Sequence, residues 1–274
     1  MFTYLYMNYF IGSFMGFLEE KKILVTGISN KYSIAFGIAK ALHKQNATLA
    51  FSYHTDRLKN KVYELAKELG VKIVIPCDVS DDNSIKRLFF NISKKWITFD
   101  GFIHSIAFAP KNQLSGDYVS SITRLDFSNV LDVSSYSFVG MAKACRSILK
   151  KGSSLLTLSY IGSKKVVPNY NVMGIAKASL ESNVRYMASC MGLNGIRVNA
   201  ISSSPIKTLS SYHIKNFKKI LNHTTSRSLN NNLTTVEDVG NTAAFLCSDL
   251  SKGITGQIIY VDGGFNITAM SNSE

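Results

Sequence analysis

The sequence predicts an α/β fold, a doubly wound parallel sheet of about seven strands with helices on both faces. Apolar runs of strand length alternate with segments of helical periodicity along most of the chain. The strand runs are apolar throughout, which is typical of strands buried on both faces. No repeat, linker or change of composition divides the chain, so residues 15–274 are predicted to form one domain.

The first strand and helix flank a glycine-containing turn. Residues 22–25 are predicted to form a strand that runs into Gly27, and Ser33 is positioned to cap the helix that follows. Gly37 lies inside this helix, where glycine is costly unless another element packs closely. The loop is longer than GxGxxG, so a phosphate-binding turn and an ordinary structural turn both remain open.

The middle of the chain continues the alternation. Strands are predicted at 48–53, 72–77 and 101–106, with helices at 56–69 and 82–96 between them. This spacing is typical of a Rossmann-type dinucleotide-binding sheet. A polar loop at 107–118, one long helix at 125–150 and a strand at 154–159 are predicted to follow.

The last quarter completes the sheet. Strands are predicted at 197–201 and 257–261, with a helix at 235–250 between them. The asparagine-rich segment 209–232 is predicted to form a mobile lid over a pocket.

The segment 159–177, SYIGSKKVVPNYNVMGIAK, carries the main candidate chemistry. Tyr170 and Lys177 are seven residues apart, close to two helical turns, so both would lie on one helix face. With Tyr160 they follow the strand 154–159, and ligands bind at the carboxyl ends of such strands. A phenol beside an ammonium suits a reaction that places negative charge on a substrate oxygen. A packing tyrosine and a surface lysine are the alternative.

Composition excludes some functions. Lysine and arginine total 31 against 18 acidic residues, a net charge of +13, but no dense basic block contains interleaved aromatic residues. We therefore expect no nucleic-acid binding, while attraction to an acidic substrate or carrier protein remains open. No apolar run has membrane-spanning length, so no membrane association is expected. Four scattered cysteines predict reduced thiols, no metal site and a cytoplasmic location.

The first fourteen residues differ from the rest. They are rich in aromatic residues and contain no lysine or arginine, unlike a signal peptide. Because Met15 opens the globular pattern, residues 1–14 are interpreted as an upstream start-site extension without a fold of its own. A weak membrane-surface anchor is the alternative.

Several segments together resemble the short-chain dehydrogenase/reductase superfamily, and more closely the enoyl-acyl-carrier-protein reductases of bacterial type II fatty acid synthesis. The resemblance covers nearly all of residues 15–270. It includes CDV at 77–79, FDGFIHSIAFAP at 99–110, SYIG with PNYNVMGIAKASLE, and ITGQIIYVDGGF. Most of the superfamily has Tyr-x3-Lys, whereas six residues separate Tyr170 from Lys177, which is the enoyl reductase arrangement.

The resemblance implies NADH-dependent reduction of the trans-2 double bond of enoyl thioesters on acyl carrier protein, by a homotetramer. It implies that Tyr170 donates to the enolate oxygen, Lys177 holds the nicotinamide ribose and Tyr160 lines the acyl site. Other implied cofactor-binding residues are Gly27, Ser33, Ile34, Asp78, Val79, Ser105, Ala107, Ile206 and Thr208. The implied acyl pocket consists of Phe108, Ala109, Met173, Phe217 and Ile220.

Cofactor choice depends on the end of the strand 48–53. His54 falls near the position where NADH enzymes of the family often carry glutamine, and no Arg-Lys pair follows to bind a 2′-phosphate. NADH is therefore expected over NADPH. The chain departs from the family at Ala107 and Ser204, where glycine is usual, and at residues 229–232, which replace Pro-Ile-Arg-Arg.

Two other functions remain open. Tyr160 and Lys164 also satisfy Tyr-x3-Lys, which would fit a 3-oxoacyl-carrier-protein reductase, although Lys164 precedes Pro168 in a loop-like stretch. A non-catalytic binding protein on the same fold is the second alternative, supported by the altered loop 229–232.

Overall fold

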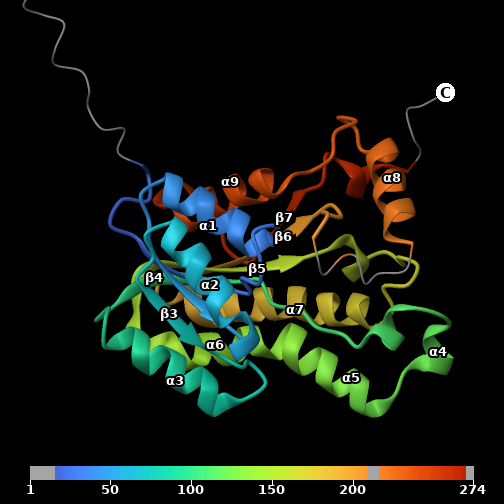
Figure 1. The fold of residues 1–274 in the computed structure, drawn as a ribbon. Coiled ribbons are helices and arrows are strands. Elements are labelled where there is room, and N and C mark those ends of the chain that lie inside the picture. Colours follow the sequence, from blue (N-terminus) through green and yellow to red (C-terminus); the bar gives the residue numbers. More distant parts are fainter. Residues whose placement is uncertain (1–15, 209–210, 212–215, 270–274) are drawn as a thin grey trace, which may run out of the picture.

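The computed structural model describes residues 16–208, 211 and 216–269 (Figure 1). Its centre is a seven-stranded parallel sheet, as the sequence predicts, and its strands have the order β3-β2-β1-β4-β5-β6-β7. The strands are β1 (Lys22–Thr26), β2 (Thr48–Tyr53), β3 (Ile73–Pro76), β4 (Phe99–His104), β5 (Leu149–Ser159), β6 (Arg197–Ser203) and β7 (Ile258–Val261). The predicted extension 1–14 lies outside the described residues.

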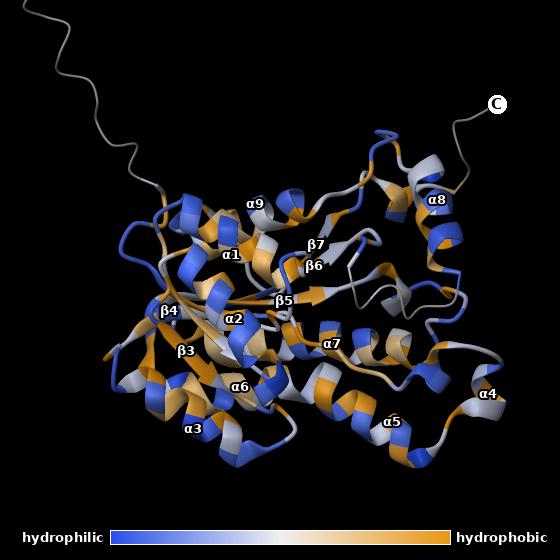
Figure 2. Ribbon diagram, viewed as in Figure 1, coloured by the Kyte–Doolittle hydropathy of each residue, from blue (hydrophilic) through white to orange (hydrophobic). Residues whose placement is uncertain are grey.

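Helices cover both faces of the sheet. On one face, α1 (Ile34–Lys44), α2 (Asp56–Glu68) and α9 (Val236–Cys247) form one apolar core with the strands. On the other face, α3 (Asp82–Ser93), α6 (Ser137–Cys145) and α7 (Val172–Gly192) form a second core. Figure 2 shows hydrophobic residues concentrated along the central strands, while the helices alternate between hydrophobic and hydrophilic residues. This pattern is the reason both layers pack on the sheet.

Two glycines explain how closely α1 and α9 pack. A Cβ added to Gly37 would lie 2.9 Å from the Val236 Cβ, and one added to Gly240 would lie 2.9 Å from the carbonyl oxygen of Gly37. The close neighbour expected for Gly37 is therefore α9, which brings the last helix of the sheet against the first.

The helix predicted at 125–150 is confirmed over most of its length, as a continuous helical run from 124 to 145 that contains a π-helical turn. The chain forms α4 (Tyr118–Ser121), α5 (Arg124–Leu131), a π-helical turn (Asp132–Tyr136) and then α6, and β5 already begins at Leu149. The hydroxyl of Ser137 donates to the carbonyl oxygen of Val133 at 2.7 Å, and Ser134 turns toward a neighbouring loop. The Ser137 bond competes with regular helical bonding where the helix widens into the π-helical turn.

Smaller differences concern strand ends. The strand predicted at 101–106 is β4, which begins and ends two residues earlier, and β3 is shorter than the predicted 72–77. Part of the predicted lid is helical, because α8 covers Phe217–Arg227. The rest includes 209–210 and 212–215, which lie outside the described residues.

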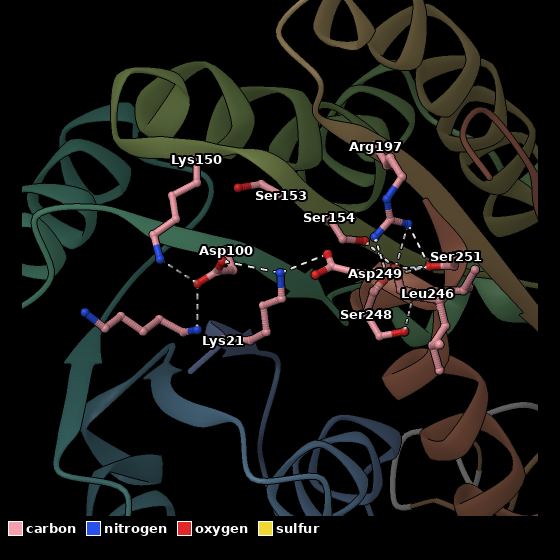
Figure 3. Close-up of polar contacts among 12 residues, drawn as sticks. Lys21, Asp100, Lys150, Ser153, Ser154, Arg197, Leu246, Ser248, Asp249 and Ser251 are labelled. Atoms are coloured by element: carbon pink, nitrogen blue, oxygen red, sulfur yellow. Dashed lines mark hydrogen bonds and ion pairs between the residues drawn. The ribbon is translucent and has the colours of Figure 1, made fainter. Parts of the chain in front are cut away.

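Charged side chains gather at the amino ends of the strands, opposite the cavity described below (Figure 3). Asp100 of β4 accepts the backbone N–H of Lys22 at 2.9 Å and lies 3.4 Å from the Lys150 ammonium. Arg197, the first residue of β6, is buried and donates to the carbonyl oxygens of Leu246 and Ser248, at 2.8 and 3.0 Å. These bonds tie four strands and α9 together at that edge.

Within the part of the chain that the structure describes, no helix is both long and apolar enough to cross a membrane.

Candidate active site

A cavity of about 700 Å³ opens at the carboxyl ends of β1, β4, β5 and β6. Its wall also includes residues of α7 and α8. β1 lies between β2 and β4, so the order of strands reverses direction at this point. Ligands of open parallel sheets bind at such a reversal, and the volume suits a small-molecule site.

Tyr160 and Tyr170 meet on the cavity wall. Their ring centroids are 5.0 Å apart with an interplanar angle of 75°, an edge-to-face contact. A Cβ on Gly162 would lie 2.5 Å from the Tyr170 ring, so glycine is needed there. Burial raises the pKa of Tyr160 to about 12, and burial followed by the neighbouring Tyr160 raises that of Tyr170 above its ordinary value. Both phenols therefore keep their protons at neutral pH and can donate them in hydrogen bonds.

Lys177 extends from α7 into the same cavity. Its side chain is buried, and Nζ donates to the carbonyl oxygen of Leu158 at 2.7 Å. Burial lowers the pKa of Lys177 to about 8, although the Glu181 carboxylate acts in the opposite direction. The ammonium is therefore charged near neutral pH while being held away from bulk water.

The turn after β1 forms another part of the wall. Gly27 has a φ of 84°, and a Cβ there would lie 1.9 Å from the carbonyl oxygen of Ser105, which follows β4. Ser33 caps α1 by accepting the N–H of Phe36 at 3.3 Å. The amino terminus of α1 thus faces the cavity through Ser33 and Ile34, and such a terminus favours phosphate.

His104 lies beneath the site at the end of β4. His104 Nε2 lies 2.8 Å from Ser137 Oγ, and Nδ1 lies 3.0 Å from Thr157 Oγ1, both within hydrogen-bonding distance. Burial, together with the charge of Lys177, lowers the pKa of His104 to about 3. A neutral imidazole therefore joins β4, β5 and α6 under the cavity floor.

The loop after β4 is held by the π-helical turn. Ser134 Oγ accepts the N–H of Phe108 and donates to the carbonyl oxygen of Phe108, both at 3.0 Å. Phe108 itself lines the cavity with its side chain about half exposed. The irregular helix thus fixes one wall of the site.

The structure brings most of the residues predicted from the sequence onto this one cavity. They are Gly27, Ser33, Ile34, Ser105, Ala107, Phe108, Ala109, Tyr160, Tyr170, Met173, Lys177, Ile206, Thr208, Phe217 and Ile220. Sequence reasoning missed other residues of the wall: Ser29, Asn30, Lys111, Leu114, Val167 and Pro205. Ser29 and Asn30 could have been found from their place in the polar loop between Gly27 and Ser33.

His54, Asp78 and Val79 do not line the cavity. They follow β2 and β3, and His54 Nε2 lies 3.5 Å from Asp78 Oδ2. Burial acts to raise the pKa of Asp78, but hydrogen bonds from Ser80 and the nearby His54 bring it below its ordinary value. Asp78 is therefore a carboxylate at neutral pH.

Lys164, the partner in the alternative Tyr-x3-Lys pair, lies outside the cavity as well. It is exposed, and its ammonium lies 5.3 Å from the centre of the Tyr260 ring. Among the described residues, no group of three or more His, Cys, Asp or Glu side chains is arranged to hold a metal ion.

Comparison with known proteins agrees with this site. The family model described as Enoyl-(Acyl carrier protein) reductase matches residues 27–266. The enoyl-acyl-carrier-protein reductase (NADH) FabI of Salmonella typhimurium is 58% identical over 260 residues, which cover 95% of this chain and 99% of that protein.

Solved structures give the same result. The crystal structure of enoyl-acyl-carrier-protein reductase (NADH) from Aquifex aeolicus aligns with a TM-score of 0.90 and 43% identity, covering 93% of this chain and all of that one. The Bacillus cereus enoyl-acyl carrier protein reductase, with NADP+ and indole naphthyridinone, aligns with a TM-score of 0.91 and 42% identity over 93% of this chain and all of that one. With its fold, its two tyrosines and its lysine in place, the chain belongs to the enoyl-acyl-carrier-protein reductase family.

Proposed function

We propose that this chain catalyses the NADH-dependent reduction of the trans-2 double bond of enoyl thioesters carried on acyl carrier protein, in fatty acid elongation. The observation that carries the proposal is the convergence of Tyr160, Tyr170 and Lys177 on one cavity at the carboxyl edge of the sheet. The family membership and the NADH in the names of its relatives support it.

The residues present fit a nicotinamide dinucleotide. The capped amino terminus of α1 suits a pyrophosphate, and the buried ammonium of Lys177 suits ribose hydroxyls beside the two tyrosines. When bound, NADH supplies the hydride. We assign cofactor contacts to Gly27, Ser33, Ile34, Ser105, Ala107, Lys177, Ile206 and Thr208.

The two tyrosines act on the thioester. As the β-carbon is reduced, negative charge develops on the thioester oxygen, and the protonated phenol of Tyr170 donates a hydrogen bond to it. Tyr160 lines the acyl site and supports Tyr170 through the edge contact of their rings. The charge of Lys177 favours the anionic state at close range in this buried setting. Protonation at the α-carbon completes the saturated chain.

An apolar part of the wall suits the acyl chain. We assign this role to Phe108, Ala109, Met173, Phe217 and Ile220. At the adenine end we place His54, Asp78 and Val79. The carboxylate of Asp78 disfavours a 2′-phosphate through charge repulsion, which supports NADH over NADPH.

One assay tests the function. Oxidation of NADH and of NADPH is followed with crotonyl-carrier protein and, in parallel, with acetoacetyl-carrier protein. We expect turnover of the crotonyl thioester with NADH. Turnover of the ketone alone would indicate a 3-oxoacyl reductase, which the exposed position of Lys164 disfavours. Normal NADH binding without any turnover would indicate a binding protein.

We further propose a homotetramer located in the cytoplasm. Exposed apolar side chains support the assembly, namely Leu125 on α5, Tyr136 on the π-helical turn and Tyr186 on α7. Light scattering on the purified protein would give the number of subunits.

We also propose that residues 1–14 are a start-site extension, and a chain beginning at Met15 should then show the same turnover.

A further inference from the structure

Glu181 is a buried carboxylate whose cost of burial calls for an explanation. It lies on α7, one helical turn after Lys177, and its side chain is almost fully buried. Among the described residues, no ion pair within 4.0 Å includes it. A buried charge is retained only when hydrogen bonds replace the water it has lost.

Two serine hydroxyls replace that water. Ser159 Oγ and Ser163 Oγ both donate to the same oxygen, Glu181 Oε1, and each distance is 2.6 Å. Such short bonds are typical of a hydroxyl donating to an ionised carboxylate. The two serines lie on either side of Tyr160, since Ser159 ends β5 and Ser163 ends the short 3-10 turn after Tyr160.

The backbone between the two serines is tightly packed against both tyrosine rings and against α7. A Cβ on Gly162 would lie 2.5 Å from the Tyr170 ring and 3.3 Å from the Tyr160 ring. A Cβ on Gly174 of α7 would lie 2.7 Å from the carbonyl oxygen of Gly162. The segment 159–163 therefore has little room to shift without moving both rings.

We propose that Glu181 is a positioning residue for Tyr160: one carboxylate oxygen of α7 holds both serines that flank Tyr160 and so sets the place of its phenol in the cavity. The inference rests on the proposed function, because it assigns Glu181 an effect on that reaction. Glu181 lies outside the cavity wall, and apart from the effect of its charge on the pKa of Lys177 it acts through the 159–163 segment.

The variants separate bonding from charge. Glu181→Ala removes both hydrogen bonds, whereas Glu181→Gln keeps an oxygen that can accept them. Ser159→Ala and Ser163→Ala each remove one donor. Ser179→Ala is the matched control, because Ser179 also lies on α7 and loses a bond, to Ser135 at 2.8 Å, that is remote from this segment.

Kinetics form the first test. For Glu181→Ala we expect kcat to fall by about tenfold or more, the scale of a misplaced catalytic group. The Kd of NADH should be the same in Glu181→Ala and Glu181→Gln, because both variants lose the charge that acts on Lys177. Glu181→Gln should recover most of the loss, and Ser179→Ala should match the wild type. In a Tyr160→Phe background, Glu181→Ala should cause no additional loss, because the effect passes through the phenol. Additive losses, or a Gln variant as poor as the Ala variant, would overturn the proposal.

Amide hydrogen exchange tests the same proposal without any turnover. The N–H groups of Ser163, Lys164 and Lys165 bond to the carbonyl oxygens of Tyr160 and Ile161. Their exchange should be faster in Glu181→Ala than in the wild type and unchanged in Ser179→Ala. Unchanged exchange in Glu181→Ala would refute the positioning role. Should Glu181→Ala not fold, Ser163→Ala carries the same two tests. If the wild-type protein reduces no enoyl thioester and exchange is still faster in Glu181→Ala, only the proposed function is refuted.

Discussion

Tyr170 and Lys177 both line the cavity, but Tyr170 lies in the turn before α7, so the shared helix face predicted from the spacing is wrong. Burial changes what each can do with its proton. Loss of water raises the pKa of the phenol and lowers that of the ammonium. The tyrosine is therefore a hydrogen-bond donor across the physiological range, whereas the lysine approaches neutrality at mildly basic pH. The two residues respond differently to mutation and to pH.

Tyr170→Phe tests the donor. We expect kcat for a crotonyl thioester to fall by about 10²–10³, the usual loss when one donor to a developing oxyanion is removed. The Kd of NADH should be unaffected. Tyr63→Phe is a matched control, since its half-exposed hydroxyl makes only a 3.4 Å contact with the carbonyl oxygen of Val74. Loss of NADH affinity equal to the loss of kcat would contradict the assigned role.

Lys177 predicts how cofactor affinity depends on pH. Its pKa of about 8 means that the ammonium is charged below this pH and becomes neutral above it. NADH affinity, measured by fluorescence titration, should therefore decrease as the pH rises through about 8. Lys177→Met should bind NADH weakly, and its affinity should change little over the same pH range. A flat profile in the wild-type protein would contradict this assignment.

At the scale of elements, local pattern predicted the regular parts of the fold. The strand expected at 48–53 is β2 without a change of boundary, because most of its residues are apolar and all but Thr48 are buried. The π-helical turn between α5 and α6 could not be predicted in this way. Neither glycine nor proline marks it, and it depends on bonds from Ser134 and Ser137 to partners in the folded state.

The residues of the candidate site likewise divide into those that the sequence predicts and those that only the folded structure reveals. Tyr170 and Lys177 were found from their spacing and the family resemblance, and they line the cavity. The roles of His104 and Glu181 depend on hydroxyl partners 18 or more residues away in the chain. Spacing along the sequence carries no signal for such partners.

Because α1 and α9 pack closely, a glycine-to-alanine substitution at their contact should have the opposite effect on stability from the same substitution at an open position. Gly240→Ala places a methyl group against the backbone of Gly37, so we expect a loss of about 1–3 kcal/mol in the free energy of unfolding. Gly192→Ala, at the exposed end of α7 with no atom within 4 Å of the added Cβ, should gain about 0.4–1 kcal/mol. Urea unfolding of both variants measures the difference. Equal effects would mean that the α1–α9 contact can yield.

Two arginines that donate to carbonyl groups differ in burial, so they should contribute differently to the free energy of unfolding. Arg197→Ala leaves the buried carbonyl oxygens of Leu246 and Ser248 without their charged donor, and we expect a loss of about 2–4 kcal/mol. Arg146→Ala removes bonds to Cys190 and Asn194 at an exposed position and should change stability by about 0.5 kcal/mol or less. Urea unfolding compares the two. A loss at Arg146 as large as at Arg197 would contradict the importance of burial.

At the scale of the whole molecule, the net charge of +13 predicts how the protein meets its substrate. An acidic carrier protein is attracted over long range, and salt screens this attraction. KM for crotonyl-carrier protein should therefore rise with added sodium chloride. The uncharged crotonyl thioester of N-acetylcysteamine serves as the control, and its KM should change little. The same salt dependence for both substrates would exclude steering by the protein's charge.

The order of the strands also has a consequence for how the protein is made. β1 pairs with β4, so Val25 aligns with Ile103, and the cavity wall takes residues from Gly27 to Ile220. Pairings between distant parts of a chain form slowly, because a long loop must close first. A nascent chain that has released β1 to β5 from the ribosome still lacks β6 and α8. The dinucleotide site is therefore a late product of synthesis, and NADH can stabilise the protein only after most of the chain has emerged.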